Sequence, residues 1–429
     1  MSGASTPDGA LTTIETTVFD WLKLLETPGT HTLWVLLIGI SIILIPLINA
    51  LLQRLRIPGL IGYLLLGFGL RLLDSRWQLL TDPVRHAFAF MADLGIVALL
   101  FRVGLEGNPQ ALLNKLPRAG LVWIGDVTVA ALTGFVAAYY LMEISLIPSL
   151  FAAAGLTATS VGVSVIAWRD AEALDSEEGN LLMDVAELDD ISGVAIMALL
   201  FSIVPVLKDG GTGIPWSEAG WAGGIFLIKF MLFIICCVLF SRYVERHLTH
   251  FSRRLETAPG QMLTVVGFGL LIAAFSNWLG FSLAIGALFA GLAFSRDPEA
   301  VRTDTPFENL YAFFTPYFFI GIGLQIDPGV LVQALGLGGA LLGAAFLGKL
   351  TGAGLPAWFI GGSAAAGLLG LSLVPRAEIA MVIVEEGREL GDWAVPPDLY
   401  GAMAIVTLGT CILAPLLLQP LLSRRNACR

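Results

Sequence analysis

The stretch LLMDVAELDDISGVAIMALL, residues 181–200, places two adjacent aspartates in a segment that is otherwise apolar enough to cross a lipid bilayer. A carboxylate at membrane depth costs roughly 3 kcal/mol or more, so such an acid predicts a functional site. Asp189 and Asp190 point about 100° apart on a helix, but both can border one polar cavity between packed helices. Glu187 lies three residues before Asp190 and therefore near its face.

The composition of the chain is that of a polytopic membrane protein. Of its 429 residues, 56% are hydrophobic and 14% are charged, whereas about a quarter of the residues are charged in an average soluble domain. The formal net charge of -10 gives no indication of nucleic-acid binding. The four cysteines lack the spacing of metal ligands, and nothing in the sequence predicts a cofactor or an enzyme.

Hydropathy predicts an all-α membrane protein with about thirteen transmembrane helices. The segments are expected at residues 33–53, 58–73, 87–105, 118–142, 147–167, 180–206, 220–241, 261–278, 281–295, 308–324, 330–352, 357–386 and 398–422. Residues 1–31 are expected to form an extracytoplasmic N-terminal segment, residues 32–425 the transmembrane domain, and residues 423–429 a short cytoplasmic tail. The N-terminus lacks the pattern of a cleaved signal peptide, so we expect the first hydrophobic segment to stay in the mature protein.

The distribution of lysine and arginine predicts the orientation in the membrane. One set of alternate loops contains most of these residues, namely Arg54, Arg56, Lys115, Arg118, Arg242, Arg246, Arg253, Arg254, Arg424, Arg425 and Arg429. Because positive residues are enriched in cytoplasmic loops, the C-terminus is expected in the cytoplasm. An odd number of spans then places the N-terminus outside, with the protein in the inner (plasma) membrane.

Two polar interruptions, GLTATSVGVS at 155–164 and GLSLVPRAEIA at 370–380, occupy corresponding places in the two halves of the chain. Matching interrupted segments predict a transporter site at which two broken helices cross near the middle of the membrane. We therefore expect an inverted repeat, with repeat one at about 33–206, a linker span at about 218–245, and repeat two at about 260–422.

The paired aspartates predict a site that binds a monovalent cation and protons. Protons and a small cation can compete for the same carboxylate oxygens of Asp189 and Asp190. Hydroxyl and freed carbonyl oxygens of Thr157, Thr159 and Ser160, in the first interruption, can complete the ligand set. The alternative is that the two acids lie at a helix end among the lipid headgroups or form a static salt bridge.

Further charged residues at membrane depth are candidates for supporting roles. Lys349, in AAFLGKLTGAG, is expected to pair with Asp189 in the cation-free site and to act as a proton carrier, with snorkelling to the surface as the alternative. Arg376 and Glu378 flank the second interruption and are expected to hold the crossing together. The sequence does not decide between ion pairing and interface anchoring for Asp93, Arg102, Asp126 and Lys229.

A series of short motifs follows in order along most of the chain. They are DLGIVALLFRVGLEGNP at 93–109, ATSVGVSVIAWRD at 158–170, ELDDISGVAI at 187–196, GFSLAIGALFAGLAFS at 280–295, PYFFIGIGLQID at 316–327, LGKLTGAGLPA at 347–357 and LVPRAEIAMVI at 373–383. In these motifs the chain resembles the cation:proton antiporter superfamily. The similarity is to the branch that contains bacterial sodium/proton antiporters with a paired aspartate and the membrane domains of potassium efflux systems.

The resemblance implies a homodimer, in which each protomer has a dimerisation panel and a six-helix core that moves as an elevator. It implies that Asp190 is the essential ion-binding acid and that Asp189 is its partner, which pairs with Lys349. Thr159 and Ser160 match the broken-helix positions near the ion. The monovalent cation would therefore bind at Asp190 and Asp189.

The resemblance also bears on stoichiometry. A paired aspartate with a lysine resembles the electrogenic members, which move more protons than cations in each cycle. Glu187 and Arg102 stand where the family usually has apolar residues. Glu187 adds a third acid before the aspartate pair, which could alter the stoichiometry or the choice of ion.

The sequence thus predicts a secondary active antiporter that exchanges Na⁺, or else K⁺ or Li⁺, for protons by elevator-type alternating access. One alternative is a potassium efflux pathway that needs a separate regulatory partner. Another is an intramembrane aspartyl protease, but its two acids should come from facing helices, whereas Asp189 and Asp190 are adjacent on one. A sensor that binds cations without transporting them is the last alternative.

Overall fold

The computed structural model describes residues 31–54, 57–77, 80–107, 109–209, 216–245, 247–248, 259–295 and 305–427. The expected N-terminal segment lies outside the described residues except for its last residue, and so do the last two residues of the expected tail. Five of the basic loop residues that predict the orientation also lie outside them, namely Arg56, Arg246, Arg253, Arg254 and Arg429.

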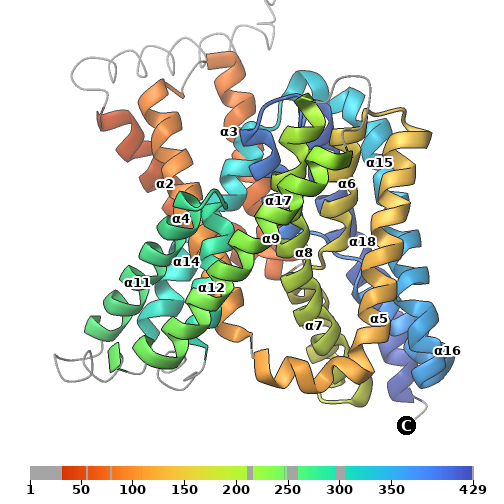
Figure 1. Cartoon of the computed structure of the whole chain (residues 1–429). Coiled ribbons are helices and arrows are strands. Elements are labelled where there is room, and N and C mark those ends of the chain that lie inside the picture. The colour runs from red at the N-terminus through yellow and green to blue at the C-terminus, as the bar shows by residue number, and fades with distance from the viewer. Residues whose placement is uncertain are drawn as a thin grey trace, which may run out of the picture.

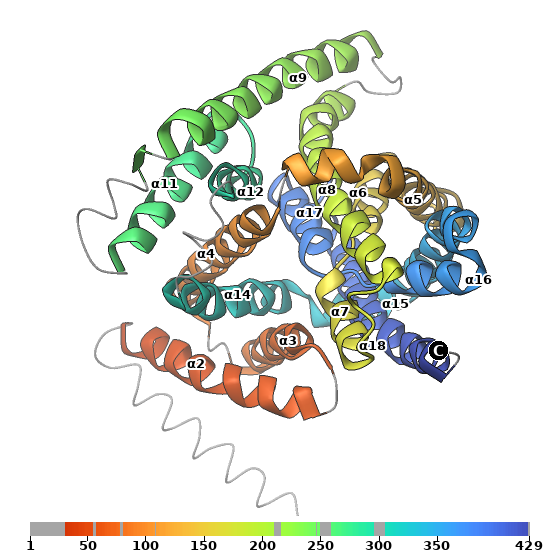
Figure 2. The same cartoon turned by 90° about the horizontal axis from the view of Figure 1, so that it is seen from below.

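One group of helices forms a layer along one side of the molecule, on the left in Figure 1 and in an arc in Figure 2. We call this layer the panel. It consists of α2 (His31–Arg54), α3 (Gly59–Trp77), α4 (Asp82–Glu106), α11 (Pro259–Trp278), α12 (Leu283–Phe294) and α14 (Thr305–Gln325). In this layer α14 packs on α3 and α4, and α12 packs on α4 and α11.

A second group of helices forms a bundle beside the panel, which we call the core (Figure 2). It consists of α5 (Pro109–Phe135), α6 (Leu146–Thr157), α7 (Val161–Asp170), α8 (Glu177–Asp209), α15 (Pro328–Gly352), α16 (Gly354–Ser372), α17 (Glu378–Glu389) and α18 (Pro397–Ala427). Here α15 packs on α5, α16 and α18, and α8 packs on α5 and α6. Because α5 packs on both α8 and α15, polar side chains of these three helices can meet inside the bundle.

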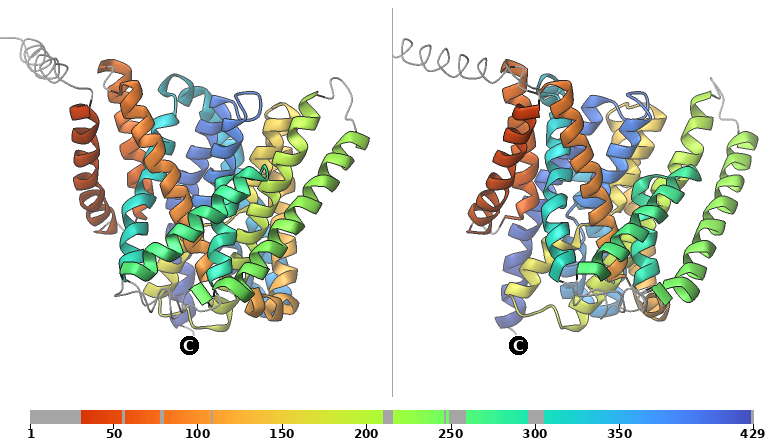
Figure 3. Two further views of the ribbon diagram at one scale, coloured as in Figure 1. Left: turned by 60° about the vertical axis from the view of Figure 1, so that its left-hand side comes forward. Right: turned by 90° about the vertical axis from the view of Figure 1, so that its left-hand side faces the viewer.

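The helix α9 (Trp216–Leu239) joins the two groups, since it packs on α8 of the core and on α12 of the panel. It continues into a π-helical turn, η2 (Phe240–Val244), and α5 likewise continues into η1 (Val136–Leu141). Figure 3 shows α2 and α9 at opposite margins of the molecule. Both expose large apolar side chains, such as Ile43 at 63% and Ile228 at 72%, as expected where a helix faces lipid.

Within the described residues, nine helical stretches are long and apolar enough to cross a membrane. The helical stretches Leu263–Trp278 and Leu283–Phe294 are apolar but shorter. Each hydrophobic segment expected from the sequence contains helix, and the described part of the chain contains no strand. The all-helical fold expected from hydropathy is therefore confirmed for these residues.

Two of the expected segments are interrupted, as the sequence predicts. The first is helical up to Thr157 and again from Val161, and the second is helical up to Ser372 and again from Glu378. The two interruptions lie against each other, because the backbone N–H of Ser160 donates to the carbonyl oxygen of Pro375 at 2.8 Å. A proline within the second interruption removes a donor and prevents a continuous helix there. The backbone N–H and C=O groups that both breaks leave without helical partners therefore lie at one crossing inside the core.

Close contact between α4 and α12 depends on two glycines. A Cβ atom on Gly104 would overlap the carbonyl oxygen of Leu288, and one on Gly291 would overlap the carbonyl oxygen of Phe101. The obstacle in each case is backbone, which cannot rotate away as a side chain can. Small residues of this kind let two membrane helices approach closely.

Gly291→Ala is expected to lower the stability of the folded protein by about 1–3 kcal/mol, because the two helices must separate to admit the methyl group. Thermal unfolding of the purified protein in detergent measures this. The matched control is Gly224→Ala in α9, where nothing lies within 4 Å of an added Cβ. There the same substitution should be neutral or slightly stabilising, since alanine is the better helix former. Equal effects at the two positions would contradict the assigned close contact.

Candidate ion-binding site

A buried lysine lies at the centre of the core. Lys349 on α15 is fully buried, and its ammonium nitrogen forms an ion pair and a hydrogen bond with Oδ2 of Asp126 on α5. The same nitrogen lies 3.0 Å from Oδ2 of Asp189 on α8. It also donates to the carbonyl oxygen of Thr157 at 2.7 Å and reaches the hydroxyl of Thr159 at 3.0 Å. One ammonium group thus contacts two carboxylates and the end of a broken helix.

The first interruption supplies the polar groups next to this lysine. Since α6 ends at Thr157, the carbonyl of that residue has no partner in its own helix, and Lys349 supplies one. The hydroxyl of Thr157 bonds to the Ala154 carbonyl at 2.7 Å, so only its carbonyl serves the site. Thr159 donates its hydroxyl to Asp189 Oδ2 at 2.6 Å and therefore fixes that carboxylate.

Arg376 and the residues around it hold the crossing together. The buried guanidinium donates from Nη1 to the carbonyls of Leu373 at 2.8 Å and Pro375 at 3.1 Å. Arginine keeps its charge, so it serves as a fixed counter-charge to the carbonyl ends of the interrupted helix. Ser160 donates its hydroxyl to Glu378. Ser160 therefore bonds across the crossing to the other interrupted segment, and the hydrogen bond to Asp189 comes from Thr159.

The two adjacent aspartates have different surroundings. Asp189 is 1% exposed and faces Lys349, whereas Asp190 is half-buried. Neighbouring residues on a helix point about 100° apart, which explains why only one of the two can face the lysine. Glu187, one turn before Asp190, is also half-buried. Asp189 is thus part of the lysine cluster, while Asp190, the next residue on α8, is the more exposed of the two.

Both acids that contact the lysine keep one oxygen without a hydrogen bond. Oδ1 of Asp126 and Oδ1 of Asp189 are buried and have no hydrogen-bond partner among the described residues. A buried carboxylate oxygen in this state is costly, because it has lost its water and gained no donor. Hard cations prefer such oxygen ligands. The donor set of the site therefore suits a small cation or a proton.

A cavity of about 570 Å³ lies between the panel and the core. Charged side chains line it, namely Arg71, Arg85, Asp93, Glu385, Arg388 and Glu389. An adjoining cavity of about 90 Å³ shares three of its acids and adds Glu386. The two groups of helices meet here, because Gln325 of α14 donates to Glu385 of α17. Tyr400 of α18 donates to the other oxygen of Glu385 at 2.6 Å.

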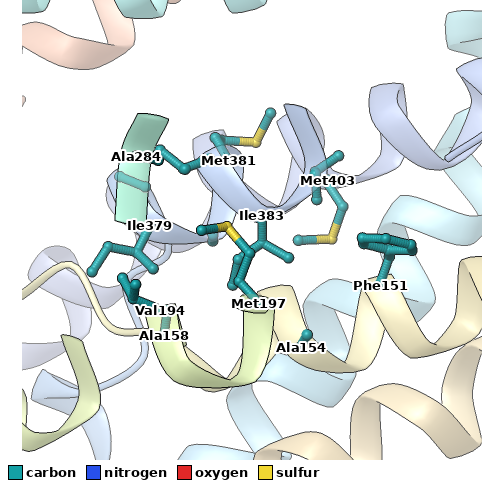
Figure 4. Close-up of a cluster of buried hydrophobic side chains, with 14 of the residues drawn as sticks. Phe151, Ala154, Ala158, Val194, Met197, Ala284, Ile379, Met381, Ile383 and Met403 are labelled. Carbon is teal, nitrogen blue, oxygen red and sulfur yellow. The ribbon is translucent and has the colours of Figure 1, made fainter. Parts of the chain in front are cut away.

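Packed apolar side chains separate this cavity from the crossing. Along α17 the sequence passes from Glu378 at the crossing, through the buried residues 379–384, to the acids at the cavity. Figure 4 shows Ile379 of this segment beside Ala284 of the panel, Ala158 of the first interruption and Val194 of α8. All four are at most 4% exposed. The lysine cluster is therefore closed off on the side of the cavity.

A comparison with protein-family profiles shows the family of the chain. The profile described as "Sodium/hydrogen exchanger, transmembrane" matches residues 39–424, which is nearly the whole of the described structure. The chain belongs to the sodium/hydrogen exchanger family. It is accordingly a multi-pass membrane protein and a transporter, not an enzyme.

Relatives of this exchanger include sodium antiporters and potassium efflux proteins. The "High-affinity Na(+)/H(+) antiporter NhaS3" of Synechocystis sp. is 26% identical over 336 residues, which are 77% of this chain and 70% of that protein. The "Glutathione-regulated potassium-efflux system protein KefC" of Cronobacter sakazakii is 32% identical over 293 residues, 65% of this chain. The matched part is only 43% of the KefC chain. The expected superfamily is thus confirmed, with sodium/proton antiporters and potassium efflux proteins among the relatives.

The fold of the exchanger is also found in a solved structure. The sodium proton antiporter MjNhaP1 from Methanocaldococcus jannaschii has a TM-score of 0.64 to this chain at 16% sequence identity. The likeness covers 92% of this chain and 99% of MjNhaP1. At this identity the comparison establishes the shared fold of a polytopic helical membrane protein.

Asp126 belongs to the exchanger's lysine cluster, whereas the sequence left its role undecided. It is the only acid in the apolar run GLVWIGDVTVAAL at 120–132, and it is fully buried. The rule that draws attention to Asp189 applies equally to it, because a lone intramembrane acid is itself a functional candidate. The other undecided charges lie elsewhere: Asp93 at the cavity, Arg102 over the Tyr311 ring, and Lys229 near the Leu279 carbonyl.

Proposed function

We propose that this protein exchanges a monovalent cation, with Na⁺ as the first choice, for protons by alternating access to a single site. The observation that carries the proposal is the fully buried Lys349 held against Asp189 at the crossing of two interrupted helices. Burial of a charge cluster at membrane depth lowers the stability of the fold, so its presence there indicates a function. Within this family, exchange of a cation for protons is the purpose that fits.

In this proposal the cation binds at Asp190 and Asp189, with oxygen ligands from the first interruption. Thr159 already bonds to Asp189, and the Thr157 carbonyl lies at the same place. A cation and a proton neutralise the same carboxylate oxygens, so the occupied site holds one or the other. Only a neutralised cluster can move through the membrane interior at low cost. Each movement of the site therefore carries either the cation or the protons.

The proposed movement is a displacement of the core against the panel. It is supported by the division of the helices into two groups with charged cavities between them. We propose thirteen membrane passes, with an inverted repeat of 33–206 and 260–422 joined by a linker span at 218–245. The homodimer and the elevator movement rest on the family resemblance of the motifs.

We propose that the C-terminus is cytoplasmic and the N-terminus outside, in the plasma membrane, from the placement of lysine and arginine in the loops. The helix α17 runs from the crossing toward the end of the molecule opposite the C-terminus (Figure 1). On this orientation the charged cavity lies on the outer side of the crossing. The apolar side chains of Figure 4 then close the site on that side, so the conformation would be one that faces inward or is occluded.

The choice of ion and the stoichiometry are finer parts of the proposal. We favour Na⁺ because the relative NhaS3 is described as a Na⁺/H⁺ antiporter. K⁺ is the alternative, since the relative KefC is described as a potassium-efflux protein. That alternative includes a regulatory partner on another chain. The aspartate pair with a lysine supports an electrogenic cycle. A protease is disfavoured further, because the two acids that do face each other from separate helices, Asp126 and Asp189, are both occupied by Lys349.

The decisive experiment uses purified protein in proteoliposomes with a fixed pH gradient and an internal pH-sensitive dye. We expect addition of Na⁺ to move protons, and Li⁺, K⁺ and Rb⁺ are added separately to rank the ions. A faster rate when the membrane potential favours net charge movement would establish electrogenic exchange. Silence toward all of these cations, in protein shown to be folded, would refute exchange and favour a partner-dependent efflux pathway or a sensor.

A further inference from the structure

Lys349 has two carboxylate partners, and only one of them belongs to the aspartate pair. Asp189 is on α8, beside Asp190 and the first interruption, whereas Asp126 is on α5, and both carboxylates contact the same ammonium. Asp126 and Lys349 are fully buried, and Asp189 is 1% exposed. The cluster therefore carries one more acid than a simple lysine–aspartate pair.

A simple pair would create a difficulty for cation binding. A cation that binds at Asp189 competes with the ammonium of Lys349 for that carboxylate, and a buried ammonium that loses its only acid is strongly destabilised. The second acid removes this difficulty, because the ammonium already bonds to Asp126 Oδ2. It also bonds to the Thr157 carbonyl at 2.7 Å. Those two contacts can persist while Asp189 turns to the cation.

We propose that Asp126 is a positioning residue of the exchange site, which retains the Lys349 ammonium when the cation takes Asp189. This inference rests on the proposed function. In this proposal Asp126 acts through the lysine, and its Oδ1, unbonded among the described residues, takes no part in binding the cation. Its role is to weaken the competition between the ammonium and the cation, so that cation affinity depends on an acid that the cation does not touch.

The packing of the helices supports a fixed place for Asp126. The helix α5 packs on both α15 and α8, and one residue of α5, Thr133, donates its hydroxyl to the Ala344 carbonyl of α15 at 3.3 Å. Asp126 is thus held by a helix that contacts the lysine helix along its length. A flexible loop could not hold an acid against a buried ammonium with the same constancy.

The test measures the equilibrium Kd by calorimetric titration of purified protein with NaCl and with KCl, and the KM and maximal rate in proteoliposomes. Asp126→Asn is expected to raise the Kd and the KM about tenfold, while the maximal rate changes less, because the ammonium then competes fully for Asp189. The matched control is Thr133→Val, which removes an uncharged contact between α5 and α15. It should leave the Kd unchanged.

A second comparison separates action through the lysine from direct action on the cation. In a Lys349→Met background there is no ammonium to retain, so adding Asp126→Asn should leave the Kd within about twofold of the Lys349→Met value. This comparison remains available if Asp126→Asn alone does not fold, since it removes both charges of the ion pair together.

The outcomes distinguish the inference from the function on which it rests. A wild-type protein that binds and exchanges cations, with an Asp126→Asn Kd equal to wild type, would overturn the positioning role alone. An equal rise of the Kd with and without the lysine would overturn it too, because Asp126 would then act on the cation directly. A wild-type protein that neither binds nor exchanges any of the cations would refute the proposed function, and the inference with it.

Discussion

Asp190→Asn is expected to abolish cation-driven proton movement while the protein remains folded. The substitution removes the carboxylate of the more exposed aspartate of the pair, and an amide can neither carry the proton nor neutralise the cation. Asp190 is only half-buried, and the change removes a charge without changing the volume, so the thermal unfolding temperature should fall little. Proteoliposomes with a pH-sensitive dye measure the exchange, and thermal unfolding in detergent measures the fold.

The control for this loss is Asp184→Asn, which removes the same charge from a half-buried position earlier on α8. We expect that variant to retain exchange. If Asp190→Asn also retains it, the ion site must be moved from Asp190 to the buried acids around Lys349. If both variants lose it, the loss reflects the charge or stability of α8 and not a specific role of Asp190.

Lys349→Met should have the largest effect on stability of any single change in the core. Methionine fills most of the space of the lysine, so the loss comes from charge and not from a cavity. Asp126 and Asp189 would then be buried without the Lys349 ammonium that they share. Removal of one partner from a buried ion pair costs about 3–5 kcal/mol. Thermal unfolding measures the loss.

The same cluster predicts a pattern in the combined variants. Adding Asp126→Asn or Asp189→Asn to Lys349→Met should cost less than the sum of the single changes, because residues in one ion-pair network are coupled. An uncharged buried change far from the cluster, Gly291→Ala, should add to Lys349→Met without coupling. Additive losses within the cluster would mean that the contacts of Lys349 with the two acids do not contribute to the folded state.

Much of the fold could be predicted because membrane helices are long and apolar. A bilayer leaves a chain few choices, so hydropathy locates the spans, and the glycine- and proline-containing segments at 155–164 and 370–380 locate the interruptions. Hydropathy could not locate a kink such as the one at Gly362 in α16, where φ is 77°. It also could not indicate the π-helical turns, which depend on local backbone geometry and carry no periodic signal.

The candidate site was predictable only where the sequence itself brings residues together. Asp189 is beside Asp190 in the chain, and Thr159 lies in the interruption, so local patterns were sufficient to select them. The bond between Lys349 and Asp126 joins residues 223 positions apart. That pairing depends on the packing of α5 against α15, which no local pattern encodes. The partner of Ser160, Glu378, is distant in the chain for the same reason.

The apolar side chains between the crossing and the cavity also act as electrical insulation. From Glu378 to Glu385 the rise along α17 is about 10 Å, and the residues between them are buried. A dry layer of that thickness prevents a file of water from joining the two sides, so the membrane stays tight to current between turnovers. Loss of that seal would turn a coupled carrier into a leak, and the cell would lose its gradients without moving one ion in exchange for another.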